Sequence, residues 1–88
     1  MTTETAKEVL HCPFKFLVLL ALEYVNLTDR ERDTLILRHM RGHTQEQVAE
    51  LFDRSVNTVQ TWEKSALDKC CKAWDGMGFI KEILSAGK

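Results

Sequence analysis

The chain has 88 residues, which is enough for one small domain and too few for two hydrophobic cores. Hydrophobic residues make up 44% of it and proline occurs once, which excludes a compositionally disordered chain. The formal net charge of -1 excludes nucleic-acid binding through bulk positive charge, so any contact with DNA must come from one polar face.

The three cysteines, Cys12, Cys70 and Cys71, favour free thiols over a disulfide framework. Their number is odd and no CxxC pair is present, which fits a reducing cytoplasm. Because neighbouring residues point in different directions on a helix, we expect one of Cys70 and Cys71 to be buried and the other to be more exposed. His39 and His43 do not stand at the spacing of zinc ligands, so the sequence predicts neither a metal nor a cofactor.

The N-terminal region divides into a loose end, from Met1 to about Lys7, and an apolar helix. Pro13 suits a first helical turn, which predicts a helix from about Pro13 to Tyr24. The apolar run Phe14–Val25 is shorter than the roughly 20 residues that span a bilayer, so no membrane segment is expected. A helix that is apolar nearly all round is either covered by its neighbours or also packs against a partner chain.

Two capping boxes mark the next two helices. Thr28 with Glu31, and Thr44 with Gln47, place a hydroxyl before a helix and a long polar acceptor three residues later. The first helix ends at Gly42, a typical C-terminal cap, and the second runs to about Asp53. The apolar positions predicted to face inward are Leu35, Ile36 and Met40 on the first helix, and Val48, Ala49, Leu51 and Phe52 on the second.

A third helix begins after a cap at Ser55 or Asn57 and ends near Asp75, before two glycines. Positions spaced three and four apart predict its buried stripe, which consists of Val59, Trp62, Ala66 and Cys70. Trp74 is either a packing residue or part of a partner surface. A short last helix from about Phe79 to Leu84 is predicted to pack on the body of the domain through Phe79, Ile80, Ile83 and Leu84.

The second and third of these helices form a predicted helix-turn-helix from Thr44 to Lys69. Only a tight turn fits between them, so they must cross steeply, and Ala49 is the small residue that such a crossing requires. The opposite face of the third helix is left exposed and polar. A helix docked with such a face outward fits the major groove of DNA.

The residues of this segment resemble region four of bacterial sigma factors and, less closely, the output domains of response regulators. The matching pattern is Leu27-Thr28-x-x-Glu31-Arg32-x-x-Leu35-x-Leu37-Arg38, then Thr44-x-Glu46-x-Val48-Ala49, then Ser55-x-x-Thr58-Val59 and Trp62-Glu63-x-x-Ala66-Leu67-x-Lys69. The resemblance implies an all-α domain with a three-helix helix-turn-helix core at 27–74 within a single domain of 1–88. A helical segment at 8–26 precedes this core and a short helix at 79–85 follows it.

The sequence departs from that family at the turn and on the reading face. Sigma region four usually has a glycine and an apolar residue in the turn, where this chain has Asp53 and Arg54. The positions that read bases in the family carry no arginine here. The predicted base-reading residues are Val56, Asn57, Gln60, Thr61 and Lys64. Because Asn and Gln pair with adenine and methyl groups contact thymine, they permit an A/T-rich site.

Phosphate contacts are predicted from basic residues and from the start of the second helix, where free N–H groups face outward. The candidates are Arg41, His43, Thr44, Gln45, Arg54 and Lys69. Lys72, Lys81 and Lys88 are interpreted as solvated surface charges. From Thr28 to Lys72, eight basic residues are balanced by eight acidic ones, so we expect a lone monomer to bind DNA weakly at physiological salt.

Two hypotheses about function follow. The first is a cytoplasmic DNA-binding transcription regulator of bacterial or phage type. It would act as a homodimer through the apolar N-terminal helix or with RNA polymerase, which the resemblance implies as a partner. The second is a polymerase- or sigma-binding adaptor that keeps the fold and has lost DNA binding. No phosphate loop or nucleophile elbow is present, so no catalytic residue and no enzyme activity are predicted. Met1 and the last helix favour a complete protein.

Overall fold

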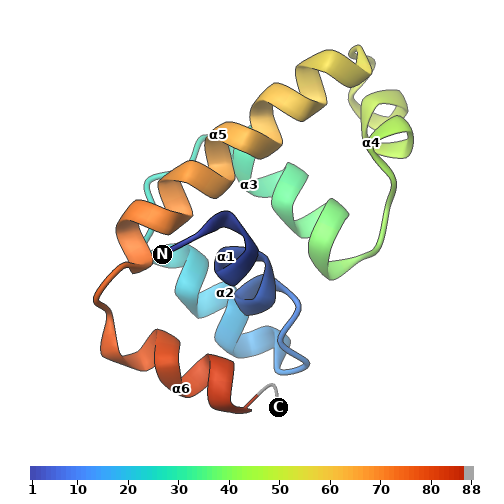
Figure 1. Cartoon of the computed structure of the whole chain (residues 1–88). Helices are drawn as coiled ribbons and strands as arrows, with labels where there is room; N and C mark the ends of the chain where they lie inside the picture. Colours follow the sequence, from blue (N-terminus) through green and yellow to red (C-terminus); the bar gives the residue numbers. More distant parts are fainter. Residues whose placement is uncertain (87–88) are drawn as a thin grey trace.

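The computed structural model describes residues 1–86, and helices joined by short turns make up this part of the chain (Figure 1). The elements in chain order are α1 (Thr3–Leu10), α2 (Lys15–Glu23), α3 (Asp29–Leu35), the π-helical segment η1 (Ile36–Met40), α4 (Gln45–Phe52), α5 (Val56–Trp74) and α6 (Gly78–Ala86). No strand occurs among the described residues, and the predicted all-α class is confirmed.

The longest helix, α5, has 19 residues and runs across the molecule (Figure 1). Helix α4 lies beside its N-terminal end, and α3 and α1 also pack on it. Helices α1, α2 and α6 gather toward its C-terminal end (Figure 1). Helix α4 and the group formed by α1, α2 and α6 therefore lie at opposite ends of α5.

The N-terminal residues form a helix, so the prediction of a loose end up to Lys7 is wrong. Helix α1 begins after Thr2, whose hydroxyl oxygen accepts a hydrogen bond from the backbone N–H of Thr5 at 3.2 Å. The apolar residues of α1 are too few to form a visible stripe over residues 1–7, but Ala6, Val9 and Leu10 are all buried. Tertiary packing therefore holds this short helix in place.

Local capping places the starts of the three helices that matter most for function. Both predicted capping boxes are present, at Thr28 with Glu31 and at Thr44 with Gln47. Of the two candidate caps for α5, Ser55 is the one used, since its hydroxyl oxygen accepts from the backbone N–H of Thr58 at 3.2 Å. Each cap satisfies a backbone donor that the first helical turn leaves free.

The helix that begins at Asp29 widens in its second half into the π-helical segment η1. Here the backbone N–H of Arg41 reaches the carbonyl of Ile36, five residues back, at 3.0 Å. The chain leaves the helix at Gly42, whose φ of +73° is readily available only to glycine. The prediction that the helix stops at Gly42 is confirmed.

Helix α2 is apolar on both of its sides, but only one side is covered. It starts at Lys15, slightly after the expected Pro13, and packs Val18, Ala21 and Leu22 into the core. Phe16, with 75% of its surface exposed, lies on the uncovered side.

The apolar side chains form two separate clusters. The larger one joins α1, α2, α3, α5 and α6, whereas the smaller one consists of Val48, Ala49 and Val59 in the helix-turn-helix. Leu51 was expected in this stripe, but it is 61% exposed, so that prediction is wrong. The helix crossing of α4 over α5 turns Leu51 to solvent, while the neighbouring Phe52 packs against the cluster.

The two tryptophans have different environments. Trp74 is completely buried, and its indole N–H donates to the carbonyl of Ala21 at 2.9 Å, so it is a packing residue. Trp62 is only partly buried and meets Phe52 edge to face, with ring centroids 6.0 Å apart. The expectation that Trp62 belongs to the buried stripe is therefore correct only in part.

The remaining predictions about α5 and α6 agree with the structure. Cys70 is buried and Cys71 is more exposed, as expected for adjacent residues on a helix. Helix α6 buries Ile80 and Ile83 against the larger cluster. Among the described residues, no helix combines the length and the apolarity that a membrane crossing requires.

Candidate nucleic-acid interface

The turn between α4 and α5 contains an aspartate, not a glycine, in the left-handed conformation. Asp53 adopts φ 53° and ψ 49°. The backbone N–H of Arg54 then bonds to the carbonyl of Ala49 at 2.9 Å and closes the turn. Aspartate enters this region more readily than most residues, so the turn keeps its geometry without glycine. Ala49 is buried in the crossing, as predicted.

The exposed face of α5 carries most of the predicted base-reading residues. Asn57, Gln60, Thr61 and Lys64 are all exposed, and their spacing of three and four puts them on one side of the helix. Val56 is half-buried and packs against the smaller apolar cluster, so only part of it is accessible.

The predicted phosphate-binding residues fall into two groups. Arg41, Thr44 and Arg54 are exposed around α4, and of these Thr44 is also bonded to Gln47 in the capping box. The other three are engaged within the protein to different degrees. Gln45 bonds to side chains of α5, Lys69 is ion-paired with Glu31, and His43 is half-buried with no hydrogen-bond partner for its Nδ1 among residues 1–86.

A groove of about 550 Å³ follows the exposed side of α5 toward its C-terminal end. Its lining residues are Thr61, Lys64, Ser65, Asp68, Lys69 and Lys72. Lys72, which the sequence analysis interpreted as a solvated surface charge, therefore shares this groove with Lys64. Lys81 is exposed on α6, and Lys88 lies outside the described residues.

A buried carboxylate, Glu63, lies beneath the reading face. His39 Nε2 donates to its Oε2 at 2.7 Å, Gln45 Nε2 donates to its Oε1 at 2.9 Å, and Arg38 Nε lies 3.3 Å from Oε2. The hydrogen bond from His39 lowers the pKa of Glu63, and Gln45 and Arg38 contribute, so that it reaches about 2 against the opposing effect of burial. Glu63 is therefore ionised at neutral pH.

His39 was considered in the sequence as a possible metal ligand, and its bond to Glu63 was not predicted. The His39 side chain is 6% exposed and bonds to Glu63. A signal was present in the sequence, because Glu63 shares the inward spacing of Val59, Ala66 and Cys70 on the same helix. A carboxylate at such a position needs buried donors, which nearby histidine and arginine supply.

The histidine pair extends this network to the N-terminal helices. His11 follows α1, and its Nε2 lies 3.1 Å from His39 Nδ1. Burial lowers the pKa of His11, and the positive charges of His39, Arg38 and Lys7 act in the same direction. Among the described residues, no group of three His, Cys, Asp or Glu side chains is arranged to hold a metal ion.

A second buried carboxylate, Glu31, fastens α3 to α5. It accepts hydrogen bonds from Lys69 Nζ at 2.7 Å and from Ser65 Oγ at 2.6 Å, besides the bond that completes its capping box. Burial opposes ionisation, but these donors together lower the pKa of Glu31 to about 2. Lys69 therefore serves the fold as well as the groove.

One comparison with known proteins, the match to a protein family, agrees with this geometry. No curated protein and no solved structure matches the chain. The family described as Sigma-70, region 4, matches residues 25–72, a stretch that begins in the turn before α3 and includes nearly all of α5. The capped helices, the tight turn and the exposed face of α5 all lie within that stretch. The chain belongs to the Sigma-70 region 4 family of helix-turn-helix domains.

Proposed function

We propose that the protein is a small cytoplasmic transcription regulator of bacterial or phage type that places the N-terminal half of α5 in the major groove of double-stranded DNA. The exposed polar face of α5 is the observation that carries the proposal. This face consists of three uncharged side chains, Asn57, Gln60 and Thr61, and one lysine, Lys64. All four lie in the N-terminal half of α5, directly after the tight turn. The role is one of binding and assigns no catalytic activity.

The chemistry of this face favours adenine and thymine. Asn57 and Gln60 each offer a donor and an acceptor, which match the N7 and N6 edge of adenine. The hydroxyl of Thr61 donates to the carbonyl of Asn57 at 3.0 Å, which leaves its methyl group for contact with a thymine methyl. Lys64 adds a single positive charge at the margin of this face.

Phosphate contacts come from both ends of α4. Arg41 precedes the helix and Arg54 follows it, and both are exposed. The first turn of α4 adds backbone N–H groups beside Thr44. Lys64 and Lys72 in the groove along α5 extend the basic surface away from the base-reading residues.

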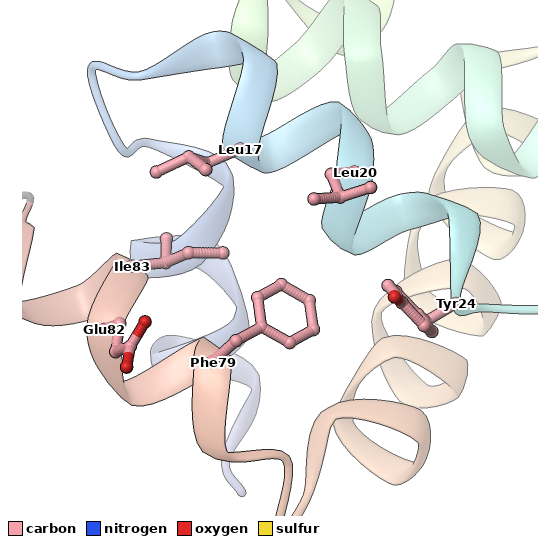
Figure 2. Close-up of a pocket in the computed structure, with 6 residues that line it drawn as sticks. All are labelled: Leu17, Leu20, Tyr24, Phe79, Glu82 and Ile83. Carbon is pink, nitrogen blue, oxygen red and sulfur yellow. The ribbon is translucent and has the colours of Figure 1, made fainter.

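A second contact would compensate for the neutral charge of the module. An exposed apolar surface is formed by Phe14, Phe16, Leu19, Leu20 and Tyr24 of the α2 segment. It continues into a pocket of about 350 Å³ between α2 and α6, lined by Leu17, Leu20, Tyr24, Phe79, Glu82 and Ile83 (Figure 2). A patch of this kind marks a surface for a protein partner. We propose RNA polymerase as that partner, because binding there would tether the weak DNA contact.

The position of the apolar surface supports this division of roles. Helices α2 and α6 lie at the end of the molecule away from α4 and the start of α5 (Figure 1). A partner bound there leaves the reading face of α5 free.

Titration of the protein against random and A/T-rich duplexes, at low and high salt, tests the DNA-binding role. We expect tighter binding to the A/T-rich duplex and an affinity that falls as salt rises. Asn57→Ala and Gln60→Ala should each weaken the preference by about 1–3 kcal/mol, whereas Lys81→Ala on α6 should change nothing. Absence of binding at every salt concentration, with both alanine variants indistinguishable from the parent, would contradict the proposal.

That negative result would support the second candidate function, an adaptor that binds a protein and not DNA. The balanced charge of the helix-turn-helix and the lack of arginine on its reading face favour this alternative.

Phe16→Glu tests the apolar surface separately, since Phe16 is 75% exposed and its replacement leaves the core intact. We expect it to abolish capture by purified bacterial core RNA polymerase, while Lys81→Ala keeps capture. Light scattering of the free protein examines a second copy as the occupant. A dimer that Phe16→Glu converts to a monomer, with no polymerase capture by the parent, would assign the surface to self-association instead.

A further inference from the structure

A continuous series of hydrogen bonds connects the buried side chain of His39 to the reading face of α5. It runs from His39 to Glu63, from Glu63 to Gln45, and from Gln45 to Gln60. The three bonds measure 2.7, 2.9 and 3.1 Å in that order. The series ends at Gln60, which is exposed among the predicted base-reading residues.

Glu63 determines which group donates and which accepts in each of these hydrogen bonds. An ionised carboxylate only accepts hydrogen bonds, so the side of Gln45 that faces Glu63 must be its NH₂ group. The carbonyl oxygen of Gln45 therefore points toward Gln60. Gln60 in turn must direct its own NH₂ group inward, as the bond from its Nε2 to Gln45 Oε1 shows.

The consequence for Gln60 is a fixed order of donor and acceptor at the protein surface. One N–H of its NH₂ group is used inside the protein, which leaves the other N–H and the carbonyl oxygen for an external partner. Bidentate recognition of adenine needs one donor and one acceptor in a defined order along the base edge. A carboxamide without such a partner rotates freely and presents either order.

We propose that Glu63, acting through Gln45, sets the orientation of the Gln60 carboxamide and thereby the base that α5 reads at this position. The assignment rests on the proposed DNA-binding function and makes Glu63 a positioning residue, since it contacts no base. His39 bonds to the other carboxylate oxygen, Oε2, and Arg38 Nε lies between the two oxygens, 3.4 Å from Oε1 and 3.3 Å from Oε2.

Glu63→Gln should exchange donors and acceptors along this series of hydrogen bonds, while a side chain of the same size still occupies position 63. The new carbonyl oxygen takes the place of Oε2, where it keeps the hydrogen bond from His39 and the 3.3 Å contact with Arg38 Nε, so the new NH₂ group faces Gln45. Gln45 must then accept with its oxygen and present its NH₂ group to Gln60. The Gln60 carboxamide flips in response, and its donor and acceptor exchange places.

A second substitution restores the original order. In the double variant Glu63→Gln, Gln45→Glu, the carboxylate at position 45 accepts from both neighbours. Gln60 must then direct its NH₂ group inward again, as in the parent. The double variant has the same net charge as the parent, and only the location of the carboxylate differs.

Two measurements on the full chain test this proposal. The first uses NMR of the free protein to follow hydrogen exchange of the Gln60 side-chain NH₂ group with water. We expect slow exchange of one proton in the parent and the double variant, and fast exchange of both in Glu63→Gln. The second selects binding sequences from a pool of random duplexes with each protein.

In the selection, Glu63→Gln should lose about tenfold of the parent's preference at one base position and keep its preference at the others. The double variant should recover the parent's base at that position, which a merely structural role of Glu63 does not predict. Selection of an unchanged sequence by Glu63→Gln, or exchange that is identical in all three proteins, would overturn the positioning role. Failure of the parent to select any sequence would instead overturn the proposed function, while the exchange measurement still decides the orientation of Gln60.

Discussion

Glu31 belongs both to the capping box of α3 and to a buried ion pair with α5. Its Oε1 accepts from the backbone N–H of Thr28 at 2.9 Å and from Lys69 Nζ at 2.7 Å. Glu31, which the sequence identifies as part of a helix cap, thus also connects α3 to α5. Loss of its charge therefore affects more than the first turn of α3.

Acid should weaken the protein through this residue. Because the pKa of Glu31 falls from its ordinary 4.5 to about 2 on folding, the ionised form stabilises the native state fully above pH 4.5. That contribution, on the order of 3 kcal/mol, is lost as the pH falls from about 4.5 toward 2. Glu63, whose pKa is also about 2, loses its contribution over the same interval.

Urea unfolding of the parent and of Glu31→Gln from pH 7 to pH 2 measures this effect. We expect the variant to be less stable at pH 7 and the difference to shrink below pH 4.5. Glu8→Gln, on the exposed side of α1, should follow the parent at every pH. A difference between parent and Glu31→Gln that is independent of pH would show that the charge of Glu31 is not what stabilises the fold.

At the scale of elements, the turn between α4 and α5 depends on Asp53, a residue with a β-carbon in left-handed conformation. The turn is short because α5 starts only three residues later, after the Ser55 cap. Its conformation positions α5 relative to α4, and through it the whole reading face.

Removing the β-carbon at this position should stabilise the turn. We expect the free energy of unfolding of Asp53→Gly to be about 1 kcal/mol higher than that of Asp53→Ala. The β-carbon of alanine makes the left-handed conformation unfavourable, whereas glycine adopts it readily. Denaturant titration of the two variants provides the measurement. The same pair at the exposed helical position Glu50 should show the opposite order, because glycine costs about 1 kcal/mol inside a helix. Equal stabilities at position 53 would contradict this account of the turn.

At the scale of the whole molecule, Trp74 joins the end of α5 to α2. Its ring is fully buried in the larger cluster, and its N–H bonds to a backbone carbonyl of α2. The apolar surface proposed for a partner lies on the other side of that same helix. Packing around Trp74 therefore holds the surface of α2 in position relative to the helix-turn-helix.

Trp74→Ala should lower the free energy of unfolding by about 3–5 kcal/mol, as for other buried aromatic side chains. Trp62→Ala should cost clearly less, because Trp62 is only partly buried. Thermal unfolding followed by circular dichroism compares the two variants, and the fluorescence of each remaining tryptophan reports its environment. A larger loss from Trp62→Ala would mean that the smaller cluster, and not the larger one, dominates stability.

The fold and the polar face of α5 were predictable because their signals are local. A hydroxyl three residues before its acceptor partner defines a helix start within one turn, as at Thr28 and Thr44. The periodic spacing of apolar residues then determines which side of each helix is buried. The prediction from spacing was wrong for Leu51. The crossing angle of two helices decides how much of each apolar stripe is covered, and the spacing of residues does not specify that angle.

By itself, the sequence determined the class of fold, the ends of the main helices and the residues that α5 exposes. Only the tertiary structure decided that residues 3–10 form a helix, that Trp74 is buried, and that Glu63 bonds to His39 and Gln45. These features depend on contacts between residues far apart in the chain, whose partners a local pattern does not specify. The direction of the Gln60 carboxamide belongs to this second group, since a carboxylate on the next turn of the same helix sets it through a residue of another helix.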